Sequence, residues 1–75
     1  MHTVFFHDLA NGTNAPKDFP RIPVAGETIA FNSSNSFFLI KGVTFNDFET
    51  AEYPTEVYAI PITQSEWVNS LKVDR

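Results

Sequence analysis

Short apolar runs with a period of two recur along this chain and end at glycine, proline or clusters of polar residues. Val4 and Phe6 share one face of such a run, and Ile29 and Phe31 share one face of another. Side chains alternate between the two faces of a strand, so this period predicts strands and not helices. Four strands are expected in this way, at residues 2–9, 27–32, 37–45 and 55–62.

The first and last of these runs also indicate where their strands lie. Apolar residues occupy both faces of 2–9, which is typical of a strand well inside a sheet or barrel. In 55–62, Val57 and Ala59 are expected on one face, with Tyr58, Ile60 and Ile62 on the other. Pro61 has no N–H for a sheet ladder, so the strand is expected to end or reach an edge there.

Residues 10–27 are expected to form turns and a stiff loop. Asn11–Gly12 predicts a turn, and residues 24–27 predict a second turn that leads into the next strand. Between them, no helix or central strand would tolerate three closely spaced prolines. We therefore expect a proline-rich surface loop over 13–23, held down by Phe19 and Ile22.

The middle of the chain predicts a hairpin and a curved strand. Residues 32–36 are all polar turn-formers between two apolar runs, a pattern typical of a hairpin loop. Gly42 interrupts the run 37–45, which indicates a bend or bulge. Such a bulge would let a small sheet curl on itself.

The last segment changes from a strand period to a helical one. Thr63 and Glu66 have the spacing of a capping box, and Trp67, Val68 and Leu71 follow as a narrow helical stripe. We expect a helical turn whose stripe covers the open end of a barrel. A final short strand at 70–74 is the alternative.

Length and composition limit how this sheet is stabilised. With 75 residues the chain has room for one domain, 1–75, and its lack of cysteine excludes disulfides and thiolate sites. Eight Phe, two Tyr and one Trp supply the large buried areas that a small core needs. The predicted fold class is therefore all-β, a small antiparallel barrel or curled sheet of roughly four or five strands with a short C-terminal helical turn.

Two neighbouring segments resemble a known group of proteins. Residues 21–29 place a proline and a Gly-acid turn before a strand, and residues 38–43 form an alternating strand after a short hairpin. Over about 21–62 this pattern resembles the small SH3-like β-barrel proteins of bacteria and phages. The resemblance implies an SH3-like fold that binds through its loops, with no particular activity. The aromatic and acidic run of proline-peptide-binding SH3 domains is missing, so that ligand is not expected.

Charge narrows the class of partner, and targeting signals bear on the compartment. The net charge is −4, and the basic residues are scattered, which disfavours a nucleic-acid binder and suits a neutral or basic partner. The N-terminal segment lacks a basic region before its apolar residues, and no apolar run is long enough to span a membrane. We expect a cytoplasmic protein with no membrane contact, either a monomer or a homodimer.

No arrangement of residues predicts catalysis, a metal or a cofactor. His2 and His7 fall on opposite faces of their strand, which does not suit a two-histidine metal site. The glycines at 12, 26 and 42 are isolated, so no phosphate-binding loop is present, and no serine has a nucleophile motif. We therefore expect a protein that is not an enzyme.

The connection 46–56 is the candidate interaction site. It combines several carboxylates with two aromatic residues outside any predicted strand, and an aromatic side chain ringed by charge is typical of protein interfaces. The predicted protein-binding residues are Asp47, Phe48, Glu49, Glu52 and Tyr53. The alternative for this connection is a solvated acidic loop whose aromatic residues fold back onto the core.

These observations favour a small accessory or regulatory protein that acts by protein–protein interaction, encoded by a bacterium, phage or mobile element. The 46–56 connection would block or bridge a partner, assisted by the 10–23 loop. The rival hypothesis is a β-barrel that binds a small ligand or single-stranded nucleic acid on exposed aromatics flanked by Arg21 and Lys41.

Overall fold

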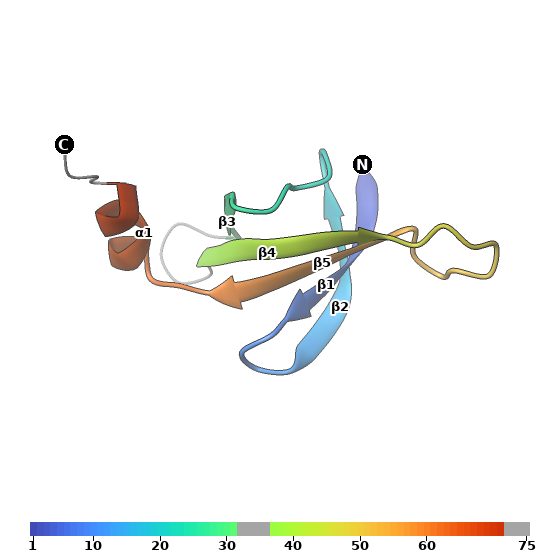
Figure 1. The fold of residues 1–75 in the computed structure, drawn as a ribbon, viewed down its shortest axis with the longest axis horizontal. Coiled ribbons are helices and arrows are strands. Elements are labelled where there is room, and N and C mark those ends of the chain that lie inside the picture. The colour runs from blue at the N-terminus through green and yellow to red at the C-terminus, as the bar shows by residue number, and fades with distance from the viewer. Residues whose placement is uncertain (32–36, 72–75) are drawn as a thin grey trace.

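A computed structural model describes residues 1–31 and 37–71 and shows a five-stranded sheet followed by a short helix (Figure 1). Across the sheet the strands lie in the order β2-β1-β5-β4-β3. The elements are β1 (His2–Asp8), β2 (Thr13–Phe19), β3 (Thr28–Ala30), β4 (Phe37–Phe45), β5 (Thr55–Pro61) and α1 (Gln64–Leu71).

The sheet is mixed and curls into a half-barrel, which confirms the predicted curled β-sheet. The pairs β1–β2, β3–β4 and β4–β5 are antiparallel. The pair β1–β5 is parallel and places Phe6 opposite Val57, so the prediction of an antiparallel sheet is wrong for this pair. Side chains alternate in the same way in parallel and antiparallel strands, so the sequence pattern did not indicate the direction of pairing. The first and last strands of the fold are therefore neighbours inside the sheet, with β5 in the middle.

The core lies on the concave face of this half-barrel and is small. Val4, Val57 and Ile40 are its largest fully buried side chains, and they come from the three inner strands of the sheet. The predicted facing is confirmed in β1, where Val4 and Phe6 point into the core, and in β5, where Val57 and Ala59 do. The buried residues of the core are Val4, Phe6, Phe19, Ile40, Val57 and Ala59.

The prediction of a loop at 13–23 is wrong for its first part, because Thr13–Phe19 forms β2. The prolines argued against a central strand, but β2 lies at the edge of the sheet and pairs with β1 alone. A residue without an N–H is tolerated in such a strand, and Pro16 lies opposite Phe5. Every side chain of β2 except Phe19 is exposed, so the sequence there shows no alternation of apolar and polar residues.

The predicted turns and the bulge are confirmed. Gly12 and Gly26 have φ values of 68° and 95°, which L-amino acids with a side chain rarely adopt, and each lies in its predicted turn. The pairing of β4 with β5 slips between Ile40 and Gly42, which places the bulge next to the glycine that predicted it. The expected hairpin at 32–36 lies outside the described residues.

The C-terminal helix forms, but it does not cover the sheet. Thr63 N donates to Glu66 Oε1 at 2.9 Å and Glu66 N donates to Thr63 Oγ1 at 3.0 Å, so the capping box is present. The helix lies beyond the end of β5 and to one side of the strands (Figure 1). Val68 and Leu71 are 41% and 57% exposed, so the prediction that this stripe closes a barrel end is wrong.

The structure also bears on membrane insertion. Within 1–31 and 37–71, no helix combines the length and the hydropathy that crossing a membrane would require.

The small core predicts a strong contrast between buried and exposed valines. We expect Val57→Ala, at a fully buried site, to lower the free energy of unfolding by about 2 to 3 kcal/mol, because it leaves a cavity between β1 and β4. Val24→Ala makes the same chemical change at a residue that is 59% exposed and should cost less than about 0.5 kcal/mol. Urea unfolding of both variants measures the contrast, and equal losses would contradict this core.

Candidate functional site

The connection between β4 and β5, residues 46–54, projects beyond the end of the sheet (Figure 1). Its base is closed by Asn46, whose backbone N–H donates to the carbonyl of Pro54 at 2.8 Å. The side-chain amide of the same residue donates to the carbonyl of Tyr53 at 2.9 Å and to Glu56 Oε2 at 2.8 Å. One asparagine thus holds both ends of the connection to the sheet.

The predicted interface residues divide into two groups. Asp47, Phe48, Glu49 and Glu52 are exposed, and Phe48 is 60% exposed. Tyr53 is half-buried, and its ring stacks on that of Phe5 with 5.0 Å between centroids and 10° between planes. Phe48 is therefore largely open to solvent, while Tyr53 folds back onto the sheet.

Tyr53 does not fold onto the core. It packs on Phe5, which alternates with the core residues Val4 and Phe6 along β1 and so lies on the opposite face of the sheet. The stack therefore ties the connection to the convex face and leaves the core unchanged.

A hollow of about 210 Å³ lies between this connection and the sheet. Aromatic rings and carboxylates form its walls, together with Asn46 and small side chains. Carboxylates and ring faces both attract cations, so the hollow has the chemistry to accept an ammonium or guanidinium group. Its lining residues are Phe5, Asn46, Phe48, Thr50, Ala51, Glu52, Tyr53 and Glu56.

A histidine–carboxylate pair beneath the connection was not predicted from the sequence. His7 Nε2 lies 2.7 Å from Glu56 Oε1, and the hydroxyl of Tyr58 donates to the same oxygen at 3.3 Å. The His7 ring stacks on Tyr58 with 4.4 Å between centroids. A carboxylate only accepts hydrogen bonds, so Nε2 carries the proton in this contact.

The hydrogen bonds around Glu56 keep it ionised. Donation from the Asn46 amide, and then from His7, lowers the pKa of Glu56 below its ordinary value of 4.5. Burial, together with the nearby charge of Glu56, raises the pKa of Tyr58 above 10.0. At neutral pH the network therefore holds a carboxylate and a neutral phenol, an arrangement that positions the connection and leaves the phenol a poor nucleophile.

The described ranges 1–31 and 37–71 contain no group of three or more His, Asp or Glu side chains that could hold a metal ion. The two histidines also have different surroundings. His2 is exposed near the N-terminus, whereas His7 is hydrogen-bonded to Glu56.

A scan of protein-family models and searches of curated proteins and solved structures found no match to this chain.

The lowered pKa of Glu56 predicts a pH-dependent contribution to stability. A carboxyl whose pKa is lower in the folded state stabilises the fold above its unfolded pKa, and this contribution is lost as the pH falls through the folded pKa. Glu56→Gln should therefore be less stable than the parent protein at pH 7, because its amide places a donor against Asn46 or His7. The difference should shrink as the pH falls below 4.5.

Urea unfolding of both proteins between pH 3 and pH 7 measures this difference, with Glu49→Gln in the same connection as the matched control. A deficit in Glu56→Gln that is the same at both ends of the range would show that the carboxylate is not held by this network.

Proposed function

We propose that this chain is a non-enzymatic protein-binding module that presents the β4–β5 connection to a protein partner. The observation that supports this most strongly is the exposure of Phe48 among the exposed carboxylates of Asp47, Glu49 and Glu52. A large apolar side chain is costly to leave in water at the end of a projecting segment, and it becomes favourable when a partner covers it.

The connection is also fixed before a partner arrives. Asn46 closes its base, and the stack of Tyr53 on Phe5 holds its second half against the sheet. A segment that is ordered in the free protein loses less conformational entropy on binding than a flexible one. Tyr53 therefore contributes by positioning the segment, while Phe48 makes the contact.

The partner surface is expected to be basic. The net charge of −4 attracts a positively charged protein over distance, and the 210 Å³ hollow can receive a lysine or arginine side chain from it. The cationic group of that side chain would bind Glu52 and Glu56 and lie against the rings of Phe5 and Tyr53. The small size and acidity of the chain suit an accessory or regulatory factor that blocks or bridges its partner.

Affinity capture from the lysate of the native host tests this proposal. We expect a dominant protein that is retained after nuclease treatment and lost with Phe48→Ala, whose affinity should fall at least about 30-fold for a residue of this kind. Phe45→Ala is the matched control, because Phe45 is 68% exposed at the end of β4 and lies outside the connection. It should retain the partner.

Charge reversal tests the electrostatic part of the proposal separately from the contact made by Phe48. Glu49→Lys with Glu52→Lys should weaken capture and reduce its dependence on salt. If Phe48→Ala, Tyr53→Ala and the charge reversal all leave capture unchanged, the connection is not the binding surface. Capture that collapses on nuclease treatment would favour nucleic acid as the ligand.

A further inference from the structure

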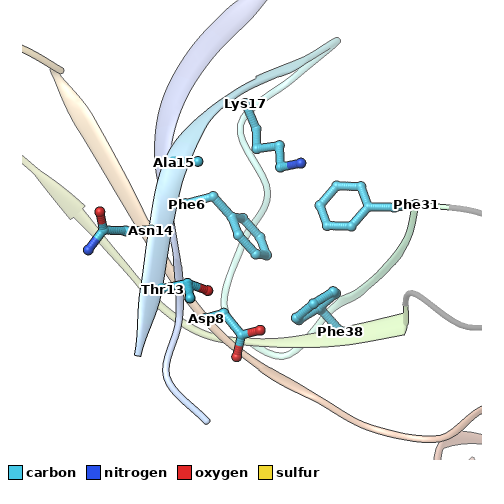
Figure 2. A pocket seen from close by; sticks show the side chains of 8 residues that line it. All are labelled: Phe6, Asp8, Thr13, Asn14, Ala15, Lys17, Phe31 and Phe38. Atoms are coloured by element: carbon cyan, nitrogen blue, oxygen red, sulfur yellow. The ribbon is translucent and has the colours of Figure 1, made fainter. Parts of the chain in front are cut away.

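The concave face of the sheet carries a second hollow, about 320 Å³ in volume, that the proposed protein-binding surface does not use (Figure 2). Phe6 of β1, Phe31 just after β3 and Phe38 of β4 converge on it, and Lys17 of β2 lies at its rim. The hollow forms because β2 and β3 are the two edges of the curled sheet and do not meet.

The three rings are mutually in contact around this space. The centroid of Phe6 lies 5.3 Å from those of both Phe31 and Phe38, and Phe31 lies 5.5 Å from Phe38. Phe6 is 4% exposed and forms the floor, whereas Phe31 is 37% exposed and leaves part of its ring open. A planar apolar molecule could therefore contact several rings and cover surface that now faces water.

The charged groups at the two ends of the hollow differ in how many of their hydrogen bonds are already made. At one end the carboxylate of Asp8 accepts hydrogen bonds from the backbone N–H groups of Ala10 and Asn11 and from the Asn11 side chain. At the other end Lys17 Nζ lies 5.0 Å from the centroid of the Phe31 ring. Among residues 1–31 and 37–71, Lys17 forms no ion pair. Its ammonium group therefore keeps donors for an anion.

We propose that this hollow binds a small planar aromatic molecule that carries one anionic group, a carboxylate or a sulfonate. The ring system packs against Phe6, Phe31 and Phe38, and the anionic group accepts hydrogen bonds from Lys17 Nζ. A volume of about 320 Å³ is at the lower end of the range for ligand sites and fits one or two fused rings.

The same geometry argues against two other occupants. A cationic ligand would be repelled by Lys17, and the carboxylate of Asp8 at the other end already accepts three hydrogen bonds. Extended single-stranded nucleic acid needs a row of cations along the rings. Arg21, the nearest basic residue in the sequence, is instead bound through both terminal nitrogens to Glu27, at 2.8 and 2.7 Å.

The test uses a matched set of probes on the full chain: 2-naphthoate, the neutral 2-naphthamide and the cationic 2-naphthylmethylamine. Binding is followed by the shifts of backbone amide signals in two-dimensional NMR spectra. We expect 2-naphthoate to bind with shifts centred on the lining residues Ala15, Lys17 and Phe38. The amide should bind about tenfold more weakly and the amine more weakly still.

Variants at exposed positions test the assigned contacts. Lys17→Met keeps the apolar stem and should reduce the affinity for 2-naphthoate about tenfold, to the level of 2-naphthamide. Phe31→Leu should weaken all probes. Lys41→Met, at the exposed bulge of β4, is the matched control and should bind as the parent protein does.

Three results would overturn the proposal. One is the absence of saturable shifts with 2-naphthoate at concentrations up to the millimolar range. Another is equal binding of the acid and the amide. The last is an effect of Lys41→Met as large as that of Lys17→Met. None of these results bears on the β4–β5 connection, which lies on a separate part of the surface.

Discussion

The parallel pairing of β1 with β5 is the constraint on which the rest of the structure depends. It joins the first and last strands of the fold as neighbours inside the sheet. On the concave face this pairing brings Val4 and Phe6 against Val57 and Ala59, which form most of the core. Without it, the hairpins on either side would each lack a buried face.

The same pairing builds the convex face. It sets His7 beside Glu56 and Tyr58, and the adjacent Phe5 becomes the platform on which Tyr53 stacks. Glu56 in turn accepts a hydrogen bond from Asn46, which closes the base of the projecting connection. The exposed position of Phe48 therefore depends on contacts that reach back to the first strand of the chain. In the proposed function, the sheet serves as a rigid support for a short acidic and aromatic segment.

Local patterns predicted much of this fold. The strand expected at 37–45 has the bounds of β4 (Phe37–Phe45), the strand expected at 55–62 is β5 (Thr55–Pro61), and the capping box at Thr63 and Glu66 is formed. Each of these signals involves residues close together in the sequence. In contrast, β2 is exposed on an edge and contains Pro16, so it carries neither buried alternation nor a clean strand composition. The alternation expected in 37–45 also fails after the bulge, because Val43 packs against the same core as Phe38 and Ile40.

The candidate site was predictable only in part, because its supports are distant in sequence. The composition of 46–56 indicated an interface, but it did not separate the outward Phe48 from Tyr53, whose partner is Phe5. The pair of His7 and Glu56 joins residues 49 positions apart across a parallel ladder, and no local spacing indicates such a contact. The hollow beside Lys17 likewise requires the curl of the whole sheet.

The central claim is that the β4–β5 connection is held in one shape before any partner binds, and backbone ¹⁵N relaxation of the free protein tests it most directly. The account predicts order parameters for residues 46–54 close to those of β4 and β5, at about 0.8. Replacing Phe5 with leucine should lower them by removing the platform for Tyr53. Order parameters below about 0.6 throughout the connection in the parent protein would show a flexible loop and contradict the account.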